Sequence, residues 1–304
     1  MSLQPNPLPD PKLAEAQETN QSKSSSLWGD AFSRIVKSKT SLIGLCIILI
    51  LIITAIFAPL IATHSPTDYA SLTDRYQSPS SEHILGTDEL GRDIFSRIVF
   101  GSRISIQIGV IAVGISMIIG VLLGGIAGYF GKWIDQIIMR IIDIMMAFPS
   151  ILLAIALVAV LGPNLRNAMI AVGIVGIPQF ARIVRSAVLS VKETEYIEAA
   201  RAIGAKHGRT LMQHVLPNCL APIIVQATLS IGTAILDAAG LSFLGLGAQP
   251  PKPEWGAMLS DGRAALQNAP WVVAFPGMAI FLVVLGFNLF GDGLRDALDP
   301  RLKQ

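Results

Sequence analysis

The chain has 304 residues, of which 52% are hydrophobic and 14% are charged, whereas about 25% of residues are charged in an average soluble protein. This composition leaves too little polar surface for two soluble domains, so a lipid bilayer is the expected solvent. The formal net charge is only +2 and no run of five basic residues occurs, which argues against binding of nucleic acid through its phosphates.

The first segment, residues 1–27, is rich in Pro, Ser and Gln and has no apolar core. It predicts a disordered cytoplasmic tail rather than a secretory signal peptide. The basic residues Arg34, Lys37 and Lys39 then precede the first apolar stretch. Residues 28–63 are therefore predicted to form a cytoplasmic flank and the first transmembrane helix.

An apolar helix needs about 20 residues to cross roughly 30 Å of hydrocarbon. The chain is expected to be an all-α integral membrane protein with six transmembrane helices, and the fourth stretch is the shortest. The second stretch carries Gly120, Gly124 and Gly128, whose four-residue spacing favours close helix packing. The six stretches are 40–63, 104–131, 144–165, 167–181, 215–236 and 264–291.

Lys and Arg gather before the first stretch, between the fourth and fifth, and after the sixth. The positive-inside rule therefore places both termini, including a C-terminal tail at 294–304, in the cytoplasm. The loop 64–103 then lies outside. Within it, Thr87 is predicted to cap a surface helix, and a structural role is favoured over ligand contact for the polar residues at its start: Thr87, Asp88, Arg92 and Asp93.

The polar segment 182–218 is too hydrophilic to span a bilayer. Thr194 can cap a helix whose first turn carries Glu195 and Glu198, which are favourable charges at the positive end of the helix dipole. Gly204 breaks that helix, and a second helix runs to Pro217. The pattern predicts a cytoplasmic helix–turn–helix that docks a partner. Binding to the membrane surface is the alternative, which the mixed charge and narrow apolar face disfavour.

Ionisable residues inside apolar stretches need a separate explanation. Asp237 lies within the apolar run 221–247, and an ionisable group at membrane depth is a candidate for a transport pathway. Arg140 and Asp143, three residues apart, can pair on one helical face. No catalytic residue, metal site or cofactor is expected, because the four histidines lie outside the spans without a partner pattern: His64, His83, His207 and His214.

One motif in the polar segment is similar to a known family. It resembles the EAA loop of ABC importer permeases, in which EAA, three residues, Gly, nine residues and I-x-L-P follow one another. The spacing matches, although His214 stands where Ile is usual. The resemblance implies a type I ABC importer permease bundle whose loop couples to an ATPase subunit through Glu198, Ala199, Ala200, Gly204, Leu216 and Pro217.

A second motif, in the predicted outer loop, resembles the LGTD-x-x-GRD-x-x-SR signature of dipeptide, oligopeptide and nickel permeases. The likeness extends over residues 28–304, is strongest to C-type dipeptide permease subunits, and includes a five-helix core at 104–293. The residues of this extracytoplasmic motif are Thr87, Asp88, Gly91, Arg92 and Asp93.

The resemblance implies a multi-pass protein of the bacterial plasma membrane that forms half of a pathway for dipeptides or short oligopeptides. Its expected partners are a second permease subunit in a heterodimer, two cytoplasmic ATP-binding subunits, an extracytoplasmic solute-binding protein and membrane lipid. The chain has no G-x-x-x-x-G-K-[ST] motif, so it is not expected to hydrolyse ATP itself. Glutathione and nickel are alternative substrates. A passive channel and an intramembrane enzyme are alternative classes of protein.

Overall fold

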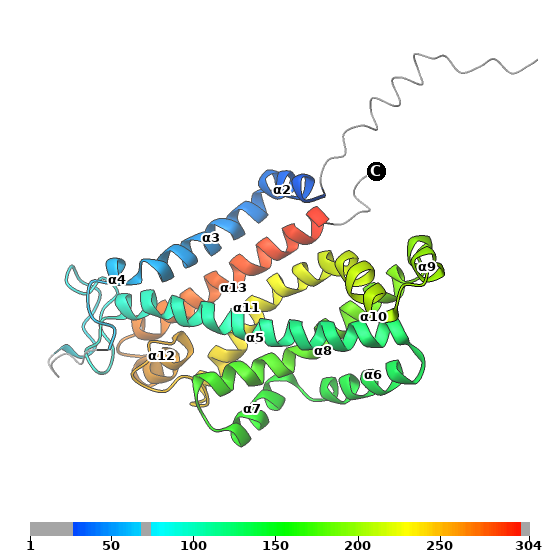
Figure 1. Cartoon of the computed structure of the whole chain (residues 1–304). Helices are drawn as coiled ribbons and strands as arrows, with labels where there is room; N and C mark the ends of the chain where they lie inside the picture. Colours follow the sequence, from blue (N-terminus) through cyan, green and yellow to red (C-terminus); the bar gives the residue numbers. More distant parts are fainter. Residues whose placement is uncertain (1–26, 68–73, 299–304) are drawn as a thin grey trace, which may run out of the picture.

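The computed structural model describes residues 27–67 and 74–298 (Figure 1). The predicted N-terminal tail, except Leu27, and residues 299–304 lie outside this part. Helices account for nearly all regular structure, and the described residues contain an isolated bridge between Thr87 and Asp93 but no strand. The α-helices are α2 (Leu27–Lys37), α3 (Lys39–Ile56), α4 (Ala58–Ile61), α5 (Ile94–Phe130), α6 (Lys132–Ala147), α7 (Ser150–Leu161), α8 (Leu165–Val191), α9 (Glu195–Ala202), α10 (His207–Arg209), α11 (Leu220–Phe243), α12 (Trp255–Gly262) and α13 (Trp271–Leu298).

Five helical stretches in the described part are long and apolar enough to cross a membrane, and six if the bent pair α6–α7 counts as one span. The prediction of an all-α membrane protein is confirmed. The weak fourth stretch becomes the 27-residue helix α8, which is the most buried of these candidates. Its lower hydropathy follows from its central place, because a helix surrounded by protein needs fewer lipid-compatible side chains.

The most extensive contact between two helices of the bundle joins α5 to α8. A Cβ atom added at Gly120 would lie 2.4 Å from the Phe180 Cβ, and one at Gly124 would lie 2.3 Å from the Ala181 carbonyl oxygen. The Ser116 hydroxyl also donates to the Gly173 carbonyl, at 2.6 Å. The glycine series is therefore a packing seam, because small residues let two backbones approach closely in lipid.

The predicted third span, 144–165, is not one straight helix. The chain turns by 95° between α6 and α7, at Phe148 and Pro149. Proline disfavours a helical conformation in the residue before it and has no N–H to continue the ladder. The predicted Arg140–Asp143 pair is also wrong. Asp143 instead accepts from Arg182 of α8 at 2.7 Å, because α6 packs beside that helix.

Two elements begin or end at residues other than those that the sequence predicted. The surface helix expected to begin at Thr87 is not a separate element, because residues 94–103 are the first turns of the 37-residue helix α5. At 1.5 Å per residue this helix is about 55 Å long, so it extends beyond the hydrocarbon. The charged side chains that suggested a boundary are satisfied locally, since Arg103 donates to the carbonyls of Ala55 and Ile56. Similarly, residues 294–298 of the predicted C-terminal tail end α13.

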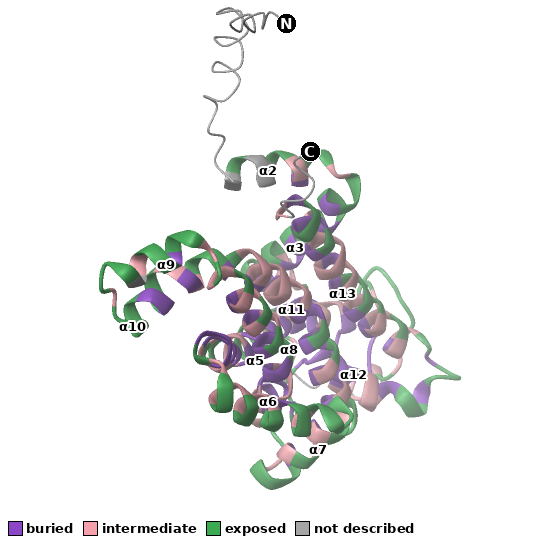
Figure 2. Ribbon diagram, turned by 90° about the vertical axis from the view of Figure 1, so that its right-hand side faces the viewer, coloured by how far each residue is buried: buried purple, intermediate pink, exposed green. Residues whose placement is uncertain are grey.

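The elements divide between two ends of the bundle. Figure 1 shows α2, α9, α10 and the last turn of α13 at one end, with α4, α12 and the segment before α5 at the other. The three basic regions of the sequence thus share one end, as an even number of crossings requires. In Figure 2, α9 and α10 project from the body as a mostly exposed arm.

Candidate functional site

The arm between α8 and α11, residues 192–219, contains the motif that resembles the EAA loop. Gly204 follows α9 with φ +88°, a left-handed conformation that glycine adopts without strain. The amide of Ala205 donates to the Ala200 carbonyl at 3.1 Å, the six-to-one bond of a helix ending in a left-handed residue. Nothing lies within 4 Å of a Cβ at Gly204, so backbone conformation is what requires glycine here.

One side chain anchors α9 to the bundle. Ile197 is fully buried, and it packs in a cluster with Val184 and Val188 of α8 and Leu211 and Val215 of the arm. Two further contacts fix the arm to the end of α5: the Tyr129 hydroxyl lies 3.2 Å from His207 Nδ1, and the Lys192 ammonium donates to the Gly128 carbonyl. The sequence pattern did not indicate the partner of His207, because 78 residues separate it from Tyr129.

The second limb of the arm is helical but irregular. A π-helical turn covers Thr210–Val215, and a 3-10 turn covers Leu216–Cys219 before α11 begins. Leu216 is half-buried, at 3.4 Å from a Cβ built on Gly125, whereas Pro217 is exposed. The π-turn and 3-10 turn explain how the second predicted helix joins a membrane span without a loop.

The six motif residues thus form a mixed surface. Glu198, Ala199, Gly204 and Pro217 are exposed, while Ala200 and Leu216 are half-buried. Ile203 beside them is an exposed apolar side chain, at 87%. An apolar, small-residue surface next to a carboxylate, on an arm projecting from the body (Figure 2), is suited to binding another protein.

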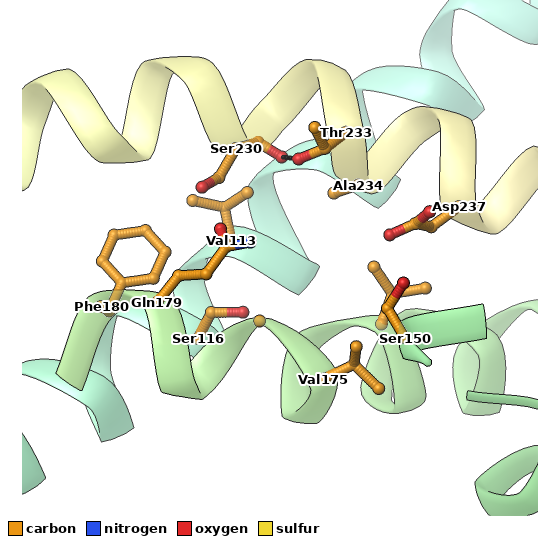
Figure 3. A pocket seen from close by; sticks show the side chains of 12 residues that line it. Val113, Ser116, Ser150, Val175, Gln179, Phe180, Ser230, Thr233, Ala234 and Asp237 are labelled. Carbon is orange, nitrogen blue, oxygen red and sulfur yellow. Dashed lines mark hydrogen bonds between the residues drawn. The ribbon is translucent and has the colours of Figure 1, made fainter. Parts of the chain in front are cut away.

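A cavity of about 230 Å³ lies inside the bundle between α5, α7, α8 and α11. Figure 3 shows the Asp237 carboxylate pointing into it. Asp237 is the only charged residue that lines it, and no lining residue is basic. The other polar groups in its wall come from three side chains on α5, α7 and α8 and two on α11: Ser116, Ser150, Gln179, Ser230 and Thr233.

The cavity wall is partly organised by hydrogen bonds. The Gln226 amide donates to Ser230 Oγ at 2.9 Å and to Gln179 Oε1 at 3.2 Å, which joins α11 to α8. No hydrogen bond to the Asp237 carboxylate is present among the described residues. A half-buried carboxylate without such a partner can offer both oxygens to a cationic group that enters the cavity.

The second motif is buried at the other end of the bundle. Arg92 Nε donates to Asp88 Oδ2 at 2.7 Å, while Asp88 Oδ1 accepts from the amides of Leu90 and Arg92. Arg97, only 1% exposed, lies 3.5 Å from the same carboxylate, and Asp261 lies 3.6 Å from Arg92. This charge network lies around the start of α5, where Arg92 and Arg97 are almost fully buried.

Other residues of this motif shape the same region. Thr87 does not cap a helix as predicted: its hydroxyl accepts from the Gln77 amide and donates to the Asp74 carbonyl. The cap is Asp93, whose Oδ2 accepts from the Ser96 amide at 2.7 Å. Gly91 has φ +74° and lies in the turn between the two acids.

Comparisons with known proteins agree along the chain. The model of a family described as binding-protein-dependent transport system inner membrane components matches residues 120–304, and the N-terminal TM domain of oligopeptide transport permease C matches residues 26–79. The chain is 57% identical over 297 residues to the dipeptide transport system permease protein DppC of Alkalihalophilus pseudofirmus, covering 98% of this chain and 97% of that protein.

Two further similarities are informative. The glutathione transport system permease protein GsiD is 49% identical in Pectobacterium atrosepticum and 51% in Escherichia coli O157:H7, each over 91% of this chain and 92% or 91% of the relative. Among solved structures, the inward-facing MetNI methionine ABC transporter matches with a TM-score of 0.55 and 21% identity, covering 67% of this chain and 96% of the other. At that identity the match shows the fold alone.

Proposed function

The chain belongs to the family of binding-protein-dependent transport system inner membrane components, and on this premise we propose that it forms half of the pathway of an ATP-driven importer of dipeptides or short oligopeptides. The observation that carries the substrate class is the 57% identity to a dipeptide permease along almost the whole chain. The likeness to glutathione permeases is lower and covers less of the chain.

The coupling surface is the exposed face of the arm. ATP-binding subunits contact Glu198, Ala199 and Ala200, while Gly204 sets the turn that presents them. Ile197 holds α9 to the ends of α8 and α11. These two helices also form part of the cavity wall, so a movement of α9 changes the position of that wall. Nucleotide binding then shifts the equilibrium between two arrangements of the bundle. The size of this shift is set by how much more tightly the nucleotide-bound ATPases bind one arrangement than the other.

The assembly has a second permease subunit, two ATP-binding subunits and a solute-binding protein. The end that carries α2, α9 and the last turn of α13 is cytoplasmic, because basic residues gather there. The opposite end, with the segment before α5, faces the binding protein outside the bacterial plasma membrane. Leu216 and Pro217 extend the coupling surface at the base of the arm.

The cavity at Asp237 is part of the pathway. A dipeptide is a zwitterion whose ammonium group can approach this carboxylate, whereas glutathione carries one net negative charge at neutral pH. At an effective dielectric of about 20, two charges 4 Å apart interact by roughly 4 kcal/mol. A lone carboxylate in the wall therefore favours the dipeptide over glutathione, which supports the first of the two substrates.

Uptake by the complete complex in proteoliposomes tests the coupling surface. Glu198→Gln should lower ATP-dependent dipeptide uptake about 10-fold, the equivalent of losing ~1.4 kcal/mol of contact with the ATPase. Glu195→Gln is the matched control, because Glu195 is also exposed in the first turn of α9. Equal uptake by both assembled variants contradicts the coupling role.

The same system tests the pathway and the substrate. Asp237→Asn should lower dipeptide uptake and raise the ratio of glutathione to dipeptide uptake, because the repulsion of the anion is removed. An unchanged ratio in the assembled variant contradicts the pathway role of Asp237. Faster uptake of glutathione than of dipeptides by the unaltered complex contradicts the substrate class.

A further inference from the structure

Three metal-ligating side chains meet at the end of the bundle opposite α9. His64, His83 and Asp93 each offer one ligand atom, a ring nitrogen or a carboxylate oxygen, and these three atoms all lie within 4.8 Å of one another. The Asp93 Oδ1 atom is 3.0 Å from His83 Nδ1 and 3.9 Å from His64 Nδ1. The two rings lie beside each other with centroids 4.7 Å apart. The spacing along the sequence gave no metal signature, because the fold alone brings these residues together.

Backbone interactions hold each ligand in place. The amide of His64 donates to Ser96 Oγ at 3.0 Å, which ties the chain after α4 to the first turn of α5. His83 closes a turn in which its amide donates to Ser80 Oγ and its carbonyl accepts from the Ser80 amide. Asp93 uses Oδ2 to cap α5, which leaves Oδ1 directed at the two rings.

Two imidazole nitrogens and one carboxylate oxygen are a donor set for Zn²⁺ with a fourth position left for water. With ligand bonds of about 2.0–2.2 Å, neighbouring ligands of a tetrahedral site are about 3.3 Å apart. The separations of Asp93 Oδ1 from the two Nδ1 atoms, 3.0 and 3.9 Å, lie on either side of this value.

Access and polarity also fit a metal ion. His83 and Asp93 are buried, whereas the side chain of His64 is 39% exposed and provides an entry path. Thr63 Oγ1 lies 3.0 Å from His64 Nδ1. The hydroxyl has to move away from Nδ1 before this nitrogen binds a metal ion, because an unprotonated ring nitrogen has a single lone pair.

We propose that His64, His83 and Asp93 form a binding site for a divalent transition metal, with Zn²⁺ as the best match to the ligand set. The bound ion links the segment after α4, the turn at His83 and the start of α5. This site is independent of the transported substrate.

Calorimetric titration of the complete transporter with Zn²⁺ tests the proposal, using a purification tag without histidine. The unaltered complex should bind one more equivalent of Zn²⁺ than the His64→Gln complex, or should bind Zn²⁺ at least about 10-fold more tightly. Loss of a residue that hydrogen-bonds to a metal ligand lowers metal affinity at least about 10-fold, and loss of the ligand itself should cost no less. Since His64 is exposed, this variant should assemble and retain dipeptide uptake. His83→Gln should give the same loss of binding.

His214→Gln is the matched control, because His214 lies in the arm at the other end of the bundle. It should bind Zn²⁺ like the unaltered complex. Co²⁺ gives a second readout, since the absorption bands of a tetrahedral Co²⁺ site should appear in the unaltered complex and be absent from His64→Gln. Identical stoichiometry, affinity and spectra in the unaltered, His64→Gln and His83→Gln complexes overturn the proposal.

Discussion

Replacing Gly124 by Ala tests whether α5 and α8 pack through their backbones. The added Cβ would lie 2.3 Å from the Ala181 carbonyl oxygen, whereas ordinary contacts begin at 3.4 Å. The obstacle is backbone, which cannot rotate away as a long side chain can. The two helices must therefore separate by about 1 Å at this level, which removes attractive contacts along the seam.

The expected cost follows from overpacking, which typically destabilises by about 1–3 kcal/mol. Alanine also favours a helix over glycine by ~1 kcal/mol, so the net effect of Gly124→Ala alone is smaller than the steric cost. Gly114→Ala is the matched control, because Gly114 lies in the same helix with nothing within 4 Å of its added Cβ. The difference between the two variants, about 1–3 kcal/mol, isolates the packing cost.

Thermal unfolding of the purified complex measures this difference. Gly124→Ala should unfold at a temperature at least about 2 °C below Gly114→Ala. Shortening the neighbouring side chain by Ala181→Gly should not rescue Gly124→Ala, because the clash is with the carbonyl oxygen of that residue. Equal unfolding temperatures for Gly124→Ala and Gly114→Ala would refute the backbone-packing argument.

Three further substitutions test other contacts by thermal unfolding of the assembled complex. Arg185 donates to both oxygens of Asp135, at 2.5 and 2.6 Å, so Arg185→Lys should lose the two-pronged geometry and cost about 1 kcal/mol; an unchanged unfolding temperature would show that the fork is unimportant. Trp255 Nε1 donates to the Ile98 carbonyl at 3.1 Å, so Trp255→Phe should lower stability by ~1 kcal/mol while keeping most of the packing. Desolvation raises the pKa of Glu254 above its ordinary value of 4.5. The folded protein therefore holds this proton more tightly than the unfolded chain, and stability falls as pH rises from 4.5 through the raised pKa; Glu254→Gln should flatten this part of the pH profile, and an unchanged slope would contradict the assignment.

Local patterns predicted most of the helices and the turn of the arm. The length of an apolar stretch identifies a span because a helix in lipid makes all its backbone hydrogen bonds within itself. Gly204 marks the end of α9 because glycine readily adopts the left-handed conformation found there. The bend between α6 and α7 was harder to predict. Pro149 indicates a break, but the 95° angle depends on packing against other helices.

Contacts between distant residues could not be read from the sequence. Charge at Arg97 and Arg103 suggested a boundary before the second span, whereas local partners let α5 begin nine residues before Arg103. Asp93 looked like one of several polar loop residues, and only the fold shows it as a helix cap beside two histidines. Asp237 was identified from the sequence because ionisable groups are rare in apolar runs. The cavity that it lines could not be predicted, because four helices have to be placed in space to form it.

Among the residues of α9 whose burial is described, Ile197 is the buried one, and this bears on the coupling that we propose for the arm. Ile197 sits in an apolar socket, while Glu198 and Ala199 next to it face outwards. Ile197 thus fixes the inner face of α9 against α8 and the second limb of the arm. If ATP-binding subunits bind the outer face of α9, as we propose, their movement is passed to α8 and α11 through the buried side chain of Ile197.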